Sequence, residues 1–230
     1  MGSNRRGCSL TLRPLPAARN TQTGCHYLCG ALEAGVVLLQ WYEPMQKFML
    51  VKHFDFPLPS PLPVFEMLVS PGEEYPLVCI GVSKGPAPVQ AVHFQTINLN
   101  SLTSWFTDSG TAVSCPGPTQ VIQLDGETVL VLIDRSLKLV NLQGLLLRRH
   151  FPAPTVPFDM AVESVALVQN CVPASWRHGV QVRPLGSAQV VEELRDTHWT
   201  FRLLRSPSTV IIETRPTEEP SGASNLYVLE

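Results

Sequence analysis

Short apolar runs of four to eight residues follow one another along most of this chain, and most of them are bounded by proline, glycine or aspartate. The group from Gln120 to His150 is the clearest, with four such runs around Asp125-Gly126 and Gln143-Gly144, and a second group runs from Ala161 to Leu194. Runs of this length and spacing predict β-strands joined by tight turns. The 21 prolines agree, because a proline inside a helix costs about 3 kcal/mol. The sequence therefore predicts an all-β protein and excludes a helical bundle.

The grouping of these runs predicts a β-propeller of four-stranded antiparallel blades, because four strands joined by tight turns are the up-and-down pattern of one blade. A blade takes about 40–45 residues, so residues 24–230 supply about five blades. Residues 1–23 differ in composition, since they place arginines among prolines and alanines without alternation. We expect 1–23 to be a flexible or non-native leader and 24–230 to be the domain.

The charge balance limits the classes of partner. The chain has 17 Lys and Arg against 19 Asp and Glu, a net charge of −2, and a pI near 6.3. No overall basic field exists to hold a polyphosphate backbone, so nucleic acid is not expected as a partner. No run approaches the roughly 18 apolar residues of a membrane span, so no integral membrane segment is expected. Six sparse cysteines, most of them in apolar runs, predict reduced thiols and a cytoplasmic location.

No catalytic motif in the sequence is complete. Gly81-Val82-Ser83-Lys84-Gly85 matches the nucleophile-elbow pattern, but Gly85-Pro86-Ala87-Pro88 cannot begin the helix which that elbow needs. We therefore predict a hairpin turn, and a serine hydrolase through Ser83 remains a distant alternative. Asp55-Phe56 is followed by Pro57, so the metal-binding tripeptide of kinases is also absent, as are the glycine-rich phosphate loops. We expect no catalytic residue.

Metal and cofactor sites are not predicted either. Cys25 and Cys29, with His26 between them, could form half of a zinc site, but no second pair of ligands follows at similar spacing. The six histidines stand singly and none forms a metal-binding motif. Phosphate-cradling glycine patterns are missing as well, so we expect neither a metal nor a cofactor.

Two aromatic segments are the candidate partner-binding residues: Trp41 and Tyr42 in the first, Trp176 and Arg177 in the second. Each aromatic residue could simply pack between blades and cover a turn. Alternatively, these side chains could anchor a protein partner, since Trp, Tyr and Arg dominate binding hot spots. The sequence leaves both interpretations open.

Several longer strings can be compared with known families, namely Gly24–Leu32, Leu39–Leu50, Phe65–Val69, Glu74–Cys79, Val140–Gly144, Trp176–Gly179, Phe201–Leu204 and Ser224–Tyr227. These strings resemble the citron homology (CNH) domain of the germinal-centre-kinase-like MAP kinase kinase kinase kinases. The resemblance covers residues 24–230. The family tends to have lysine where Arg177 stands, which keeps the charge but changes the donor geometry.

The resemblance implies a seven-bladed propeller, of which this chain would hold the carboxyl portion of about five blades. It implies a non-catalytic regulatory and protein-interaction module that acts in stress-activated (JNK) MAP kinase signalling. Its implied partners are small GTPases, signalling adaptors and the parent kinase domain. The alternative hypothesis is that the chain is classed as a serine/threonine protein kinase only through its parent protein, although the catalytic domain is absent from it.

Overall fold

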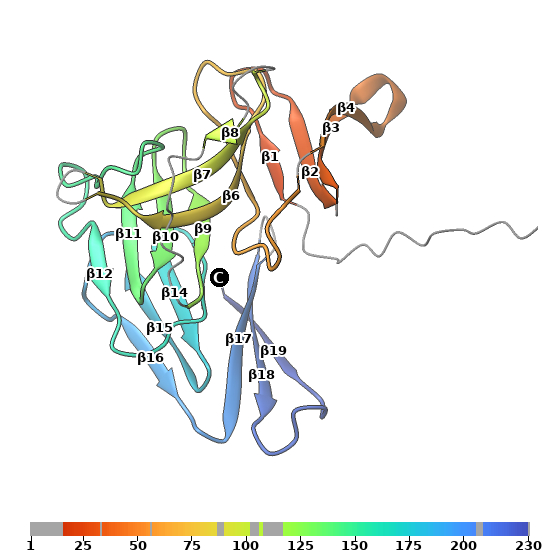
Figure 1. Cartoon of the computed structure of the whole chain (residues 1–230). Coiled ribbons are helices and arrows are strands. Elements are labelled where there is room, and N and C mark those ends of the chain that lie inside the picture. The colour runs from red at the N-terminus through yellow and green to blue at the C-terminus, as the bar shows by residue number, and fades with distance from the viewer. Residues whose placement is uncertain are drawn as a thin grey trace, which may run out of the picture. The chain divides into compact units, whose positions relative to one another are not determined.

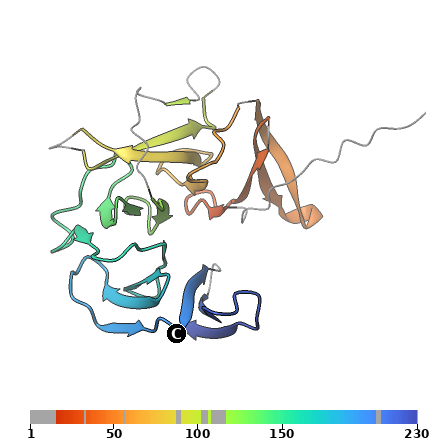
Figure 2. The same ribbon diagram turned by 60° about the horizontal axis from the view of Figure 1, so that its bottom comes forward.

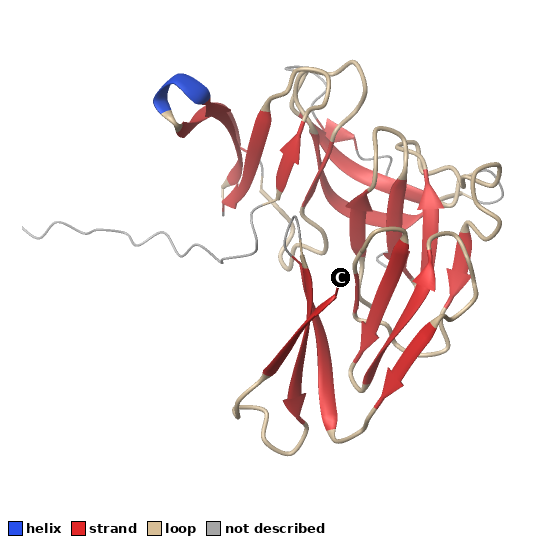
Figure 3. Ribbon diagram, turned by 180° about the vertical axis from the view of Figure 1, so that it is seen from behind, coloured by secondary structure: helices blue, strands red, loops and turns tan. Residues whose placement is uncertain are grey.

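The computed structural model describes residues 16–32, 34–55, 57–86, 90–101, 106–107, 117–205 and 209–229. Within these ranges the chain forms nineteen short strands and a single turn of 3-10 helix (Figure 1). No helix in the described ranges has the length and apolar character needed to cross a membrane. The strands, red in Figure 3, lie in antiparallel sheets, four of them four-stranded. In each sheet the strands that follow one another in the sequence are hydrogen-bonded neighbours. The predicted all-β class with four-stranded antiparallel sheets is confirmed.

The described residues divide into two compact units, one within residues 1–80 and 96–106 and the other within 81–95 and 107–230. The first unit contains a sheet with the order β1-β2-β3-β4. A register shift between Leu38 and Leu39 marks a bulge against β4. The elements of this sheet are β1 (Ala17–Arg19), β2 (His26–Leu32), β3 (Gly35–Tyr42), the 3-10 turn η1 (Glu43–Met45) and β4 (Lys47–Asp55).

Alternating side chains of β2 and β3 form the core of the first unit. Tyr27 and Cys29 from β2, with Val36 and Leu38 from β3, are all at most 1% exposed. They pack with buried residues further along the chain, namely Leu62, Met67, Val78, Ile80, Ile97 and Leu99. Burial raises the pKa of the Cys29 thiol to about 12, so this cysteine stays protonated and inert. The described residues include no cluster of three or more potential metal ligands.

A second sheet, β5-β6-β7-β8, contributes segments to both units. Its strands are β5 (Glu66–Leu68), β6 (Leu77–Lys84), β7 (Val92–Asn98) and β8 (Phe106–Thr107). Ser83 lies in β6 and is only 5% exposed, and the chain that follows β6 at Gly85 and Pro86 is not helical. A buried hydroxyl on a strand without a following helix cannot act as a nucleophile elbow. Ala87 and Pro88 lie outside the described residues.

The second unit holds three further sheets, with the orders β12-β11-β10-β9, β13-β14-β15-β16 and β17-β18-β19. Figure 2 shows the last two side by side, and contacts of β17 with β13, β14 and β15 join them. Their strands are β9 (Gln120–Gln123), β10 (Val129–Ile133), β11 (Ser136–Val140), β12 (Thr155–Pro157), β13 (Ser164–Val165), β14 (Cys171–Trp176), β15 (Gly179–Pro184), β16 (Glu192–Arg195), β17 (Trp199–Arg205), β18 (Val210–Pro216) and β19 (Asn225–Leu229).

One strand of this unit lies elsewhere than the sequence pattern predicts. The last of the four apolar runs between Gln120 and His150, residues 145–150, is not the fourth strand of its sheet; that strand is β12, which pairs with β11. The carboxamide oxygen of Asn141 accepts the backbone N–H groups of Gln143 and Leu145, which closes a turn there. Only an isolated bridge from Leu146 to Val140 follows, so the run covers the sheet end without extending it.

Candidate functional site

The first candidate surface lies on the hairpin formed by β3, η1 and β4, where Trp41 and Tyr42 end β3. Six large apolar side chains here are between 36% and 59% exposed, and we call them the hairpin surface: Tyr42, Met45, Phe48, Met49, Leu50 and Val51. Exposed apolar side chains gathered in this way commonly mark an interaction site. Trp41 itself is half-buried, and its ring contacts that of Phe48.

Contacts within the hairpin hold its tip in one conformation. The ring of Trp41 meets Phe48 edge to face at 5.1 Å between centroids, and its Nε1–H donates to the Glu43 carboxylate. Gln46 donates from Nε2 to Oε1 of Glu43 at 2.8 Å. The hydrogen bonds from Trp41 and Gln46 lower the pKa of Glu43, which therefore remains a charged acceptor. A pre-organised apolar tip loses little entropy when a partner binds.

The strand β4 offers a free edge beside these side chains. Among the described strands it pairs only with β3, and its residues 47–51 are exposed on both faces. Phe48, Met49 and Leu50 pair in regular register with β3 and therefore point alternately to two uncovered sides, and Val51 lies at the bulge that follows them. Such an edge can accept an added strand whose side chains cover both sides.

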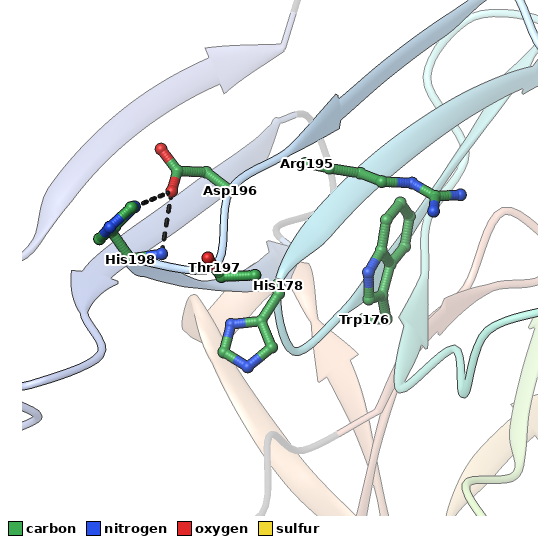
Figure 4. A pocket seen from close by; sticks show the side chains of 6 residues that line it. All are labelled: Trp176, His178, Arg195, Asp196, Thr197 and His198. Atoms are coloured by element: carbon green, nitrogen blue, oxygen red, sulfur yellow. Dashed lines mark hydrogen bonds and ion pairs between the residues drawn. The ribbon is translucent and has the colours of Figure 1, made fainter.

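The second candidate surface is an open cleft of about 440 Å³ in the second unit, which we call the rim cleft (Figure 4). It lies between the β14–β15 turn and the β16–β17 connection. Six residues line it: Trp176, His178, Arg195, Asp196, Thr197 and His198.

Backbone hydrogen bonds fix the two walls of the rim cleft against each other. The N–H of Asp196 donates to the carbonyl of His178 at 3.0 Å, and Nδ1 of His178 lies 3.1 Å from the carbonyl oxygen of Trp199. Because a carbonyl oxygen only accepts, Nδ1 carries the proton and Nε2 is the remaining ring nitrogen. The N–H of Phe201 donates to the carbonyl of Arg177 at 3.0 Å. The cleft is therefore formed by the fold itself.

The structure brings together part of the predicted site in each unit. Trp41 and Tyr42 share the hairpin, and Trp176 lines the rim cleft, whereas Arg177 is exposed in the same turn without lining it. The sequence analysis missed the residues of the β16–β17 connection, such as Arg195. No motif marks them, because only the pairing of β15 with β16 carries them to the β14–β15 turn.

Comparison with known proteins gives concordant results. The profile of the CNH domain family matches residues 15–205. Mitogen-activated protein kinase kinase kinase kinase 3 of Homo sapiens is 50% identical over 211 residues, which cover 92% of this chain and 23% of that protein. The Rattus norvegicus protein of the same name is also 50% identical over 211 residues, and 24% of its length is covered. The chain thus spans about a quarter of the length of these relatives.

A solved structure supports the fold. The AfRom2 CNH domain superposes with a TM-score of 0.57 at 11% identity, and the match covers 95% of this chain and 64% of that one. At this identity the likeness concerns the fold alone. The match agrees with the antiparallel sheets described above.

Proposed function

Because the chain belongs to the CNH domain family, we propose that it is a regulatory protein-interaction module of a MAP kinase kinase kinase kinase. CNH domains are non-catalytic, so this module acts by binding and not by phosphotransfer. In the proposal it works in the cytoplasm, in stress-activated (JNK) MAP kinase signalling. Its partners are small GTPases, signalling adaptors or the kinase domain of the parent protein.

The hairpin surface is the observation that carries the proposal. Large apolar side chains exposed together commonly mark an interaction site, and these lie on and beside an edge strand that can pair with a partner. Its aromatic and methionine side chains are enriched in the centres of protein interfaces. The hydrogen bonds of Trp41 and Gln46 to Glu43 keep the tip in a defined shape.

Within the family, two segments look most like the haematopoietic progenitor kinase member. They are Glu213-Thr214-Arg215-Pro216 and Gly179-Val180-Gln181-Val182. We therefore propose that the partners of this chain overlap most with those of that member. The curated relatives described above carry another member's name, so a side-by-side binding comparison of the two CNH domains tests this choice.

A cellular competition experiment tests the proposed role. The chain is expressed in human cells under osmotic stress, and phosphorylation of JNK is measured. We expect the wild-type chain to compete for partners and to alter the stress response. A triple variant, Tyr42→Ser, Met45→Ser and Leu50→Ser, is expected to lose this effect, because these three side chains are 47%, 53% and 59% exposed.

A matched control separates the hairpin surface from exposed apolar residues in general. Leu226, Tyr227 and Val228 of β19 are 59%, 54% and 58% exposed, so changing all three to serine removes a comparable amount of apolar surface. This control is expected to act as the wild type does. Equal effects of the wild type and the hairpin variant on JNK phosphorylation would contradict the proposal.

A further inference from the structure

The rim cleft presents hydrogen-bond donors, and Trp176 supplies the first of them. Its indole packs against the backbone at Gly179, where a Cβ would lie only 2.4 Å from the ring atom Cζ2. The guanidinium carbon of Arg195 lies over the ring, 5.4 Å from the centroid. Figure 4 shows the indole nitrogen turned toward the side on which His178 lies. Among the residues drawn in Figure 4 no hydrogen bond to this N–H is seen, and indole is a donor only.

Arg195 supplies the second set of donors. Its Nε donates to the carboxylate of Glu193, which fixes the guanidinium over Trp176. Its two terminal nitrogens make no hydrogen bond to any described residue, and the side chain is 62% exposed. A guanidinium held in place through Nε keeps its terminal N–H groups for a second, anionic acceptor.

The carboxylates near the cleft are already engaged. Asp196 accepts the backbone N–H of His198 at 2.9 Å and lies 3.0 Å from Nδ1 of the same residue. Figure 4 shows its carboxylate turned away from Trp176. The bonds from His198 lower the pKa of Asp196, so it stays an ionised acceptor of those bonds. Glu193 is likewise occupied by Arg195.

The positive and negative groups around the cleft therefore differ in whether they can still bind a ligand. Arg177 stands exposed between Trp176 and His178, and no contact of its side chain is seen among the described residues. The terminal nitrogens of Arg195 and the guanidinium of Arg177 remain open as donors, whereas both carboxylates accept bonds. A neutral apolar ligand would leave these donors without partners, which costs free energy. An anionic group would satisfy them.

We propose that the rim cleft binds an anionic side chain of a protein partner, a phosphoryl group or a carboxylate, between the indole N–H of Trp176 and the guanidinium of Arg195. This inference rests on the proposed function as an interaction module and gives that module a second, separate contact. The chemistry that both sources share is a compact oxyanion that accepts charge-assisted hydrogen bonds. The surrounding aromatic ring then contacts the partner's backbone.

Nuclear magnetic resonance on the full chain tests the inference directly. The indole N–H signal of Trp176 is followed while inorganic phosphate is added, with the signal of Trp41 as the internal reference. We expect a saturable shift of the Trp176 signal and no shift of the Trp41 signal. Arg195→Gln is expected to weaken the binding about fivefold or more, because one charge-assisted partner is lost. Arg149→Gln, which removes the same charge from an exposed site outside the cleft, is expected to leave it unchanged.

Three peptides of one sequence then distinguish the sources of the anion. They carry phosphoserine, glutamate or serine at one position, and their affinity is measured by fluorescence anisotropy. Tighter binding of the phosphoserine or the glutamate peptide than of the serine peptide, by about tenfold, supports the inference and identifies the group. Equal affinity of all three peptides overturns it. Equal effects of Arg195→Gln and Arg149→Gln on the phosphate titration would also overturn it.

The failure of this inference is distinguishable from failure of the proposed function. The serine variants of Tyr42, Met45 and Leu50 leave the rim cleft intact, and Arg195→Gln leaves the hairpin surface intact. If phosphate does not shift the Trp176 signal but the hairpin variant still loses the cellular effect, only the proposal for the rim cleft is refuted. The opposite pattern refutes the hairpin as the interaction surface.

Discussion

At the scale of single residues, Gly179 decides whether Trp176 can form a wall of the rim cleft. A Cβ at this position would lie 2.4 Å from the indole and 2.5 Å from the carbonyl oxygen of Leu194. The second contact is with backbone of the neighbouring strand, which cannot turn aside as a side chain can. Glycine is therefore required here by close approach of the two strands and the ring.

Gly179→Ala is expected to lower the free energy of unfolding by about 1–3 kcal/mol, as overpacked sites do. Urea titration followed by tryptophan fluorescence measures this loss. Gly222→Ala is the control, because its nearest contacts would be at 3.1–3.2 Å and call only for a small adjustment. Equal free energies of unfolding for the two variants would contradict the close approach of Gly179 to the indole and to the neighbouring strand.

Glu213 gives a pH-dependent prediction. Its carboxylate accepts a hydrogen bond from Nη2 of Arg215 at 2.7 Å. This bond lowers the pKa of Glu213, and burial opposes that shift. A carboxyl whose pKa is lowered by folding stabilises the protein above its unfolded pKa, about 4.3, and loses that contribution as the pH falls through the lowered value. Glu213→Gln should therefore cost about 1 kcal/mol near neutral pH and progressively less under acid.

Urea unfolding of both proteins between about pH 7 and about pH 3 checks this sign. The exposed Glu218 provides the control, since Glu218→Gln is expected to follow the wild type at every pH. A difference between wild type and Glu213→Gln that grew toward low pH would contradict the assignment.

At the scale of elements, β1 shows what a pattern of apolar runs cannot reveal. The sequence analysis placed residues 1–23 in a leader, yet Ala17–Arg19 pair with β2. Three residues are too few to show alternation, so the strand carries no periodic signal. Its position depends on contacts of the residue that follows it in the sequence. The buried Asn20 donates from Nδ2 to the carbonyls of Glu73 and Glu74. Residues 1–15 lie outside the described part of the chain.

Asn20→Asp tests the contribution of this element. The substitution keeps the oxygen that accepts the N–H groups of Gln22 and Thr23, but turns a negative oxygen toward two carbonyls. We expect a loss of about 2–4 kcal/mol, because a buried donor is replaced by a charge without a partner. Hydrogen exchange of the Tyr27 amide, which lies on β2 opposite Ala18, measures whether β1 detaches. Unchanged protection in the variant would show that Asn20 does not anchor β1.

The strands of the second unit were the most predictable elements. β10 has five consecutive buried residues, Val129–Ile133, between turns marked by Asp125-Gly126 and Asp134-Arg135, so composition and punctuation agree. The run 145–150 has the composition of a strand but does not form one. Its leucines cover a sheet end, and Asn141 turns the chain before it. Side-chain capping of this kind depends on geometry that apolar spacing does not encode.

The exposure of β4 could not be predicted from the sequence either. Phe48-Met49-Leu50-Val51 has the composition of a strand covered on both faces, yet all four residues are exposed. Only the sheet order, which puts β4 at an edge, shows that nothing described covers it. Trp41 and Tyr42 could be selected from sequence because Trp and Tyr are enriched in binding hot spots, whereas no motif marked Arg195.

At the scale of the whole molecule, the family assignment predicts the absence of catalysis. Incubated with ATP and a generic protein substrate, the chain should transfer no phosphate above background, because it has no glycine-rich loop and no metal-binding tripeptide. A radiolabelled phosphotransfer assay measures this, with an active MAP kinase kinase kinase kinase as the positive control. Turnover that copurified with the chain and was abolished by a substitution in it would favour the kinase hypothesis.

Recognition of a protein partner through the hairpin surface is the central claim, and a direct binding titration tests it best. The chain is immobilised, and purified small GTPases in both nucleotide states and the kinase domain of a MAP kinase kinase kinase kinase are passed over it. We predict saturable binding of at least one of these proteins, weakened about tenfold or more by the serine variants of Tyr42, Met45 and Leu50 and unchanged by those of Leu226, Tyr227 and Val228. Equal affinity of the wild type and the hairpin variant, or no binding by any protein of the panel, would contradict the account.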